Sequence, residues 1–275
     1  MATVQDAPYG VLTDDGERVC KLGLCGNSGV GKSSIHRRLA GEPFREHHQT
    51  TLAPDFAIVK REMPDKRVVR ITVWDTVGME RCKALSALSF RGAHAIVGVY
   101  DITDRNSYDD ALDWIARAQR VCGTIDPYII LVGNKVDLAE TARAVTIDEA
   151  RLLCEQWNFC AMEVSALDMT GVDELAMALC AEIHERYTRW RKQLRGSKIA
   201  PPRALPKSEA LNIIDPLNIV NKVTPRRMEP ENAEWAAQRG TVDLSAVMAG
   251  GSRPVPRKPP PVSFWDRVSQ MTCSN

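Results

Sequence analysis

The stretch of sequence that decides the fold is Gly26-Asn27-Ser28-Gly29-Val30-Gly31-Lys32-Ser33-Ser34. It has the spacing GxxxxGK[ST], and it stands between a predicted buried strand over residues 19–24 and a predicted helix over residues 32–39. Glycines let the backbone curl with its N–H groups inward, and the N-terminus of a helix favours an anion. Each residue of the stretch is therefore a candidate phosphate contact. Lys32 is predicted to reach the terminal phosphates of a nucleotide, and the Ser33 hydroxyl is a candidate Mg²⁺ ligand.

A second motif, Asn134-Lys135-Val136-Asp137, directly follows a predicted strand over residues 129–133. A carboxylate at Asp137 can accept hydrogen bonds from both N1–H and the exocyclic amine of guanine, whereas adenine offers neither donor. Hydrogen bonds to a charged group contribute about 1.5–3 kcal/mol each. Lys135 can lay its alkyl stem along the base. The motif predicts a guanine site, to which Ser165 and Ala166, after the last predicted strand, can add a backbone N–H.

The order of predicted elements indicates an α/β fold. Apolar and alternating runs predict six strands, over residues 19–24, 56–62, 67–74, 95–100, 129–133 and 160–164. Helical periodicity predicts helices over residues 32–39, 107–121, 147–158 and 172–193. Strands that alternate with helices form a mostly parallel sheet covered on both faces, with ligands at the carboxyl ends of the strands.

Composition argues against several other classes of protein. The formal net charge is +1, and charged residues make up 26% of the chain, which does not fit a general nucleic-acid coat. No DNA or RNA reader pattern is present, so we expect no nucleic-acid partner. No apolar run approaches the roughly 18 residues that a membrane span needs, and the first residues lack a signal-peptide pattern. We therefore expect a cytoplasmic protein.

Proline divides the chain. Eleven of the 16 prolines lie in residues 198–275, which show short apolar bursts and no sustained period. This composition predicts a flexible N-terminal segment over residues 1–17, a folded domain over residues 18–195, and a proline-rich, largely disordered tail over residues 196–275.

Taken together, the motifs resemble the Ras superfamily of small GTPases, most closely its Rab branch. The resemblance covers about residues 18–190 and is carried by GNSGVGKSS, TTLAPDF, WDTVGMER, FRGAHAIVGVYDITDRNSY, GNKVD and EVSAL. It implies the P-loop NTPase (small G-protein) fold and GTP/GDP with Mg²⁺ as ligands. It also implies a switch that hydrolyses GTP to GDP and phosphate in vesicle or membrane traffic. The alternative is a GTP-locked or hydrolysis-deficient scaffold that recruits partners.

The resemblance also implies roles for individual residues. Thr51 would ligate Mg²⁺ and hold the γ-phosphate, Asp75 would hold Mg²⁺ through water, and Gly78 would bind the γ-phosphate through its backbone. Lys32, Thr51 and Gly78 are then the candidate catalytic residues. Leu167 stands where the family usually has Lys, and its side chain can cover the edge of the base.

Met79 stands where the family usually has the Gln that orients the attacking water. A thioether cannot donate a hydrogen bond and accepts one only weakly. We therefore predict slow intrinsic hydrolysis. The alternative is that another side chain, or an activating partner, substitutes. Val77 and Ala53-Pro54 also differ from the residues that the family usually has at these positions. We expect these differences to affect the motion of the switch segments and the identity of the effectors.

The same resemblance implies partners at the two switch segments, residues 47–56 and 75–91. These partners are an exchange factor, an activating protein and effectors. Trp74 is a core aromatic or, if it is exposed, a candidate effector contact.

The tail holds two further candidate sites. Residues 253–261 can form a polyproline II rod, which is either a spacer or a ligand for an SH3-type partner. Cys273 is a candidate lipidation site, although it lies in neither a C-a-a-X box nor a double cysteine. One lipid chain anchors only marginally, so membrane association would be peripheral and reversible, on the cytosolic face.

Overall fold

The computed structural model describes residues 9–46, 55–75, 89–122, 127–194 and 204–206. All of them belong to the first of two units into which the chain divides, residues 1–214. Within these ranges, no helix combines the length and the apolar character needed to cross a membrane.

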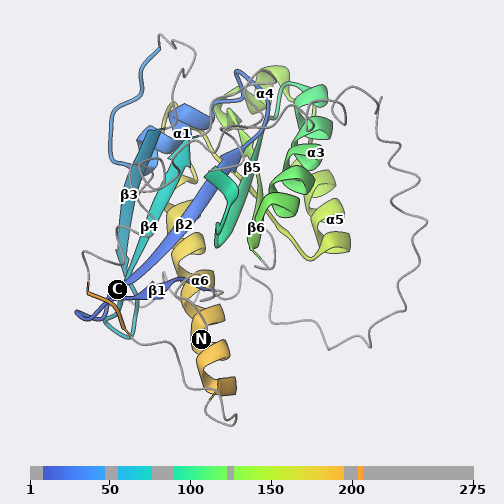
Figure 1. Ribbon diagram of the computed structural model, residues 1–275. Helices are drawn as coiled ribbons and strands as arrows, with labels where there is room; N and C mark the ends of the chain where they lie inside the picture. Colours follow the sequence, from blue (N-terminus) through green and yellow to red (C-terminus); the bar gives the residue numbers. More distant parts are fainter. Residues whose placement is uncertain (1–8, 47–54, 76–88, 123–126, 195–203, 207–275) are drawn as a thin grey trace, which may run out of the picture. The chain divides into compact units, whose positions relative to one another are not determined.

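A mixed sheet forms the centre of the fold (Figure 1). Its strands are β1 (Val11–Leu12), β2 (Arg18–Cys25), β3 (Asp55–Glu62), β4 (Val68–Asp75), β5 (Ala95–Asp101), β6 (Tyr128–Asn134) and β7 (Cys160–Glu163). The order across the sheet is β3-β4-β2-β5-β6-β7. Strands β4, β2, β5, β6 and β7 run parallel, and β3 pairs antiparallel with β4.

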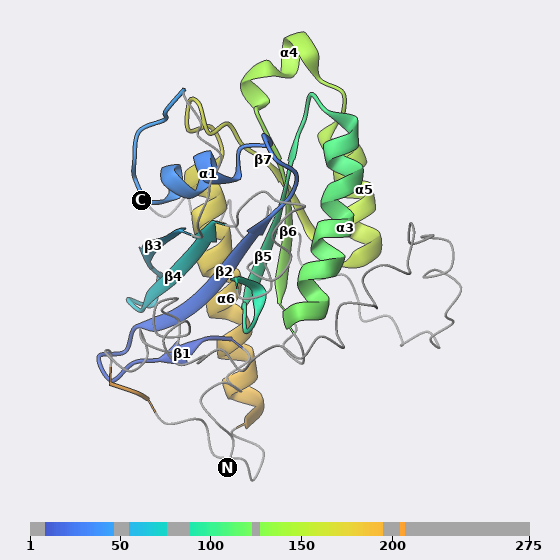
Figure 2. The same ribbon diagram turned by 45° about the horizontal axis from the view of Figure 1, so that its top comes forward.

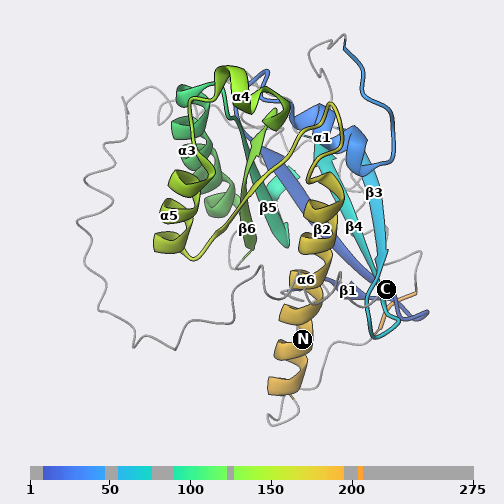
Figure 3. The same cartoon turned by 180° about the vertical axis from the view of Figure 1, so that it is seen from behind.

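Helices cover both faces of the sheet. They are α1 (Lys32–Leu39), α3 (Arg105–Cys122), α4 (Ala139–Ala142), α5 (Ile147–Trp157) and α6 (Val172–Leu194), with a 3-10 turn η2 (Val136–Leu138). Helices α1 and α6 pack against strands β3 and β4 on one face of the sheet. Figure 3 views the molecule from behind, and there α6 lies in front of the sheet. Helices α3 and α5 lie side by side on the other face (Figure 2).

This architecture confirms the predicted α/β class with six principal, mostly parallel strands and helices on both faces. The predicted helix over residues 32–39 has the observed bounds, and each of the six predicted strands matches an observed strand to within one residue at each end. Strands β2, β5 and β6 are buried at every position, as central strands of α/β proteins are, so continuous apolar runs identify them.

The N-terminal segment differs from the prediction of a flexible stretch over residues 1–17. Residues 11–12 form β1, which pairs antiparallel with β2 through Val11 and Val19. The hairpin closes at Gly16, whose φ of 83° suits glycine. Asp15-Gly16 is a turn signal between two apolar runs, and it could have predicted this hairpin from the sequence.

One part of the predicted tail also belongs to the sheet. Leu205 forms a parallel bridge with Thr13, and its N–H donates to the Leu12 carbonyl at 2.9 Å. The Leu205 carbonyl accepts from Asp14 N–H at 2.8 Å. The side chain of Leu205 is only 9% exposed. Burial of this leucine, together with two backbone hydrogen bonds, explains why residues 204–206 return to the domain after α6.

Helix α3 packs closely against strand β5. A side-chain carbon at Gly98 of β5 would lie 2.5 Å from the Ile115 side chain of α3. Glycine at this position therefore lets α3 approach β5. Gly98 pairs with Cys25, the last residue of β2, so this approach lies next to the start of the predicted phosphate loop.

Candidate nucleotide site

The predicted site residues that the structure describes converge at one edge of the sheet. Strands β2, β4, β5 and β6 are parallel, so their carboxyl ends, at Cys25, Asp75, Asp101 and Asn134, lie at the same edge. The residues from 26 to 34 follow β2 there, and Asn134-Lys135-Val136-Asp137 follows β6. The fold thus brings together two motifs that are about a hundred residues apart in the sequence.

Two glycines allow the turn from β2 into α1. Gly26 has a φ of 137°, and a side-chain carbon there would lie 2.1 Å from the Val99 carbonyl oxygen. Gly31 has a φ of 97°, and a side-chain carbon there would lie 2.1 Å from Asn134 Nδ2. Both positions need glycine for conformation and for space, and Lys32 then begins α1.

Gly31→Ala is expected to lower the free energy of unfolding by about 2–4 kcal/mol, from left-handed strain and the displaced Asn134 amide. Gly29→Ala is the matched control, because Gly29 has a φ of 80° but open space around it. The control should lose only about 1 kcal/mol from the conformational strain. Urea unfolding of nucleotide-free protein measures both values without ligand linkage. Equal losses in the two variants would contradict the close contact.

Lys32 is buried at the centre of the loop. Its Nζ donates to the Gly26 carbonyl at 2.9 Å and to the Asn27 carbonyl. Burial lowers the pKa of Lys32, while the nearby Asp75 carboxylate and Cys25 oppose that shift. The loop itself thus holds the Lys32 side chain through two of its carbonyls, with the Asp75 carboxylate nearby.

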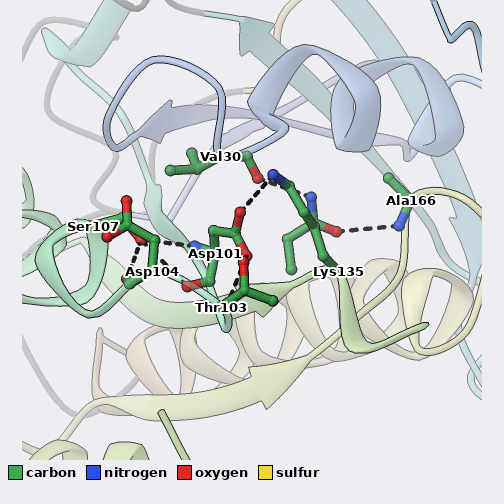
Figure 4. Close-up of polar contacts among 8 residues, drawn as sticks. Val30, Asp101, Thr103, Asp104, Ser107, Lys135 and Ala166 are labelled. Atoms are coloured by element: carbon green, nitrogen blue, oxygen red, sulfur yellow. Dashed lines mark hydrogen bonds and ion pairs between the residues drawn. The ribbon is translucent and has the colours of Figure 1, made fainter. Parts of the chain in front are cut away.

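Asn134 joins the two motifs. Its Nδ2 donates to the Val30 carbonyl at 2.8 Å, and its Oδ1 accepts from the Ala166 N–H at 3.1 Å. Figure 4 shows Val30 and Ala166 at the two ends of this link. The asparagine is 2% exposed, so it fixes the loop after β2, the end of β6 and the loop after β7 relative to one another.

Lys135 forms an ion pair that the sequence analysis did not anticipate. Its Nζ contacts Asp101 Oδ2, and the two side chains point toward one another in Figure 4. Although burial alone raises the pKa of Asp101, hydrogen bonds from Lys135 and Thr103 hold it below its usual value. Asp101 pairs in register with Asn134, so its place at the end of the neighbouring strand was the signal that could have found it.

The remaining predicted guanine contacts gather around Asp137. Asp137 is exposed, and its Oδ1 accepts from the Ser165 hydroxyl at 2.6 Å. The Ser165 hydroxyl also accepts from the Leu167 N–H at 3.2 Å. Leu167 is 49% exposed, so its side chain is available to an incoming base. Arg38 of α1 donates to the Ala166 and Leu167 carbonyls, both at 2.9 Å, and was also missed from the sequence.

Comparison with known proteins agrees with this geometry. A sequence model described as the Ras family matches residues 21–185. The chain belongs to the Ras family of small GTPases. It is 36% identical to the Ras-related protein RABD2a of Arabidopsis thaliana over 66% of this chain and 87% of the relative. It is also 36% identical to the Ras-related protein RIC1 of Oryza sativa subsp. japonica, over 60% and 81% of the two chains. The GTP-binding protein yptV2 of Volvox carteri is again 36% identical, over 62% and 78%.

Several predicted site residues of this Rab-like GTPase lie outside the described residues. Among the candidate catalytic and metal-binding residues these are Thr51 and Gly78. Among the positions that differ from the usual family residue they are Val77, Met79 and Ala53-Pro54. In the tail they are Cys273 and residues 253–261. Of the predicted Mg²⁺ ligands, Ser33 lies in the first turn of α1 and Asp75 at the end of β4.

The structure decides between the two alternatives for Trp74. Trp74 is 3% exposed, and the Lys21 ammonium lies 4.1 Å from its ring centroid, so Trp74 belongs to the interior of this small GTPase. Phe56 and Ile58 are instead exposed, at 38% and 42%, on the outer side of the edge strand β3. Alternation along β3 turns these two apolar side chains outward and buries Ala57.

Proposed function

We propose that this chain is a Rab-like molecular switch that binds GTP and GDP and hydrolyses GTP to GDP and phosphate. The observation that carries the proposal is the hydrogen bond from Asn134 Nδ2 to the Val30 carbonyl, which couples a phosphate-binding loop to a guanine-selective motif. An ATPase would gain nothing from a carboxylate at Asp137, because adenine has neither the N1–H nor the amine at C2 through which guanine donates to it.

The nucleotide that copurifies with the chain tests this proposal. We expect guanosine nucleotide in the purified protein, and we expect excess GDP, but not ADP, to displace a fluorescent GDP analogue. Empty protein without a preference for guanosine over adenosine nucleotides would contradict the proposed function.

The side chains present also fit Mg²⁺. Ser33 and Asp75 offer hydroxyl and carboxylate oxygens, which are the donors this hard ion prefers. Thr51 is proposed as a further ligand. When bound, Mg²⁺ would neutralise charge on the nucleotide phosphates. This chain's own contribution is the position of Lys32, whose Nζ is held by the Gly26 and Asn27 carbonyls.

Slow intrinsic hydrolysis is the second part of the proposal, because Met79 cannot orient water through two hydrogen bonds. Met79→Gln is expected to speed single-turnover hydrolysis roughly tenfold or more, by positioning the attacking water. Met79→Leu is the matched control, since leucine also lacks hydrogen-bonding groups, and its rate should equal that of the native chain. A native chain as fast as Met79→Gln would contradict slow hydrolysis.

A hydrolysis-deficient scaffold is the alternative function, and Met79 is the residue that favours it. Turnover with and without cell extract separates the two functions, because an activating protein in the extract would accelerate a switch and leave a scaffold unchanged.

We place the proposed switch in vesicle or membrane traffic on the cytosolic face of membranes, on the strength of its resemblance to the Rab branch. Exchange factors, activating proteins and effectors would bind at the two switch segments. The exposed Phe56 is the last residue of the first segment, Ile58 lies two residues beyond it, and both offer apolar contact area to an effector. Lipidation at Cys273 would supply a reversible anchor.

A further inference from the structure

The side-chain amide of Asn27, the second residue of the phosphate loop, is clamped by helix α3. Its Nδ2 donates to Asp110 Oδ2 at 2.6 Å, and its Oδ1 accepts from Trp114 Nε1 at 2.9 Å. Asp110 and Trp114 are four residues apart on α3 and therefore share one face of the helix. Both ends of a single amide are thus bound to one helix that lies outside the sequence motifs for nucleotide binding.

The same residue contacts the lysine of the loop. The backbone carbonyl of Asn27 accepts a hydrogen bond from Lys32 Nζ. Near the other end of the loop, the Val30 carbonyl accepts from Asn134. The loop is therefore braced twice: from α3 at residue 27 and from the end of β6 at residue 30.

The anchor on α3 is itself well held. The ring of Trp114 packs against the buried core between α3 and the sheet, and the Arg117 guanidinium lies 5.3 Å from its centroid. The close approach of α3 to Gly98 fixes the distance of the helix from the sheet. Because the indole is fixed by packing, its N–H can hold Asn27 in one orientation.

From this geometry we infer that Asp110 and Trp114 are positioning residues for nucleotide binding. They hold Asn27, and through its carbonyl Lys32, in the conformation that receives the phosphates, and they slow nucleotide release. The inference rests on the proposed function and names an element that regulates the same site. A loop held in its binding conformation before the ligand arrives loses less conformational entropy on binding.

The polarity of the clamp makes it testable by exchanging the two residues. Asn27 donates to a carboxylate, so an aspartate at position 27 would face Asp110 with like charge. If position 110 then becomes asparagine, its amide can donate to the new carboxylate, whose second oxygen still accepts from Trp114. The exchange therefore restores both hydrogen bonds between position 27 and α3. In the one between positions 27 and 110, the donor and the acceptor are exchanged.

Dissociation of a fluorescent GDP analogue from the full chain, in excess Mg²⁺ and GDP, measures the effect. Asn27→Asp is expected to speed release about three- to tenfold, and the double variant Asn27→Asp/Asp110→Asn should return to within about twofold of the native rate. Asp113→Asn, at an exposed carboxylate of the same helix, is the matched control and should release GDP at the native rate. A double variant that releases GDP as fast as Asn27→Asp would overturn the inference.

Tryptophan fluorescence gives a second, independent measurement. The Trp114 indole donates directly to the loop, so removal of nucleotide with EDTA should change the emission of the native chain. Trp114→Phe keeps an aromatic ring in the core but removes the N–H donor. We expect this variant to lose most of the emission change and to release GDP about threefold faster. An unaltered emission change together with an unaltered rate would contradict the role of Trp114.

Failure of the inference and failure of the proposed function give different results. A chain without guanosine preference would overturn both. A chain that binds GDP selectively, and whose release rate is the same in Asn27→Asp, Asn27→Asp/Asp110→Asn and the native protein, would overturn the clamp alone.

Discussion

Asp137→Asn is expected to lower the affinity for GDP by about 10²- to 10⁴-fold, because two hydrogen bonds to a carboxylate are worth about 1.5–3 kcal/mol each. Asp137 is exposed at the edge of the sheet, and its Oδ1 already accepts from Ser165, which orients the carboxylate. Asparagine keeps the shape of the side chain but offers only one acceptor oxygen. The loss should appear in equilibrium titration with a fluorescent GDP analogue.

A change of base provides the matching control for Asp137→Asn. Xanthine has a carbonyl where guanine has the exocyclic amine, so the asparagine amide can donate to it. The variant should therefore bind xanthosine diphosphate better than GDP, while the native chain prefers GDP. Glu140→Gln, at an exposed carboxylate of α4, should leave both affinities unchanged. If Asp137→Asn kept native GDP affinity, the carboxylate would not contact the base.

Lys32→Met is expected to lower the affinity for guanine nucleotides by roughly 10³-fold. A charge pair at about 4 Å contributes about 4 kcal/mol where the effective dielectric constant is near 20, which corresponds to that ratio. Methionine fills similar space without charge, so the loss should be larger for GTP and GDP than for guanosine itself. Titration with all three ligands separates the contribution of the phosphates from that of the base.

Lys21→Met is the matched control for Lys32→Met, since Lys21 and Lys32 are the two buried lysines among the residues that the structure describes. Its Nζ donates to the Arg91 carbonyl at 3.1 Å and lies over Trp74, away from the phosphate loop. Both variants should lower thermal stability, but only Lys32→Met should lower nucleotide affinity. Equal affinity losses would indicate a general effect of removing a buried lysine.

Most of the fold could be predicted from the sequence, because the buried central strands of an α/β protein are also continuous apolar runs in its sequence. The run from Ala95 to Asp101 is buried at every position, and a continuous apolar run of that length is typical of a central parallel strand. The β1 hairpin was missed because two residues of strand give almost no periodic signal. The return of Leu205 was missed because a bridge of one residue leaves no pattern in the sequence at all.

The candidate site likewise has residues that the sequence predicts and residues that only the structure identifies. The motifs around Lys32 and Asp137 were predicted from spacing, because backbone conformation and hydrogen-bonding chemistry restrict which residues can serve at those positions. The partners that hold them, Asp101, Arg38 and Trp114, were not predicted. Each of these side chains contacts a residue that is distant from it in the sequence, so the contact depends on how the helices and strands are placed in space.

The fold class, the phosphate loop and the selectivity for guanine could be predicted from the sequence alone, since each follows from residue types at fixed spacing along the chain. The contacts of Asn27 with α3 and of Lys135 with Asp101, and the burial of Trp74 next to the exposed Phe56, could be known only from the three-dimensional structure. The physical reason is that side-chain hydrogen bonds and burial depend on distances between elements, and those distances are set by packing rather than by order along the chain.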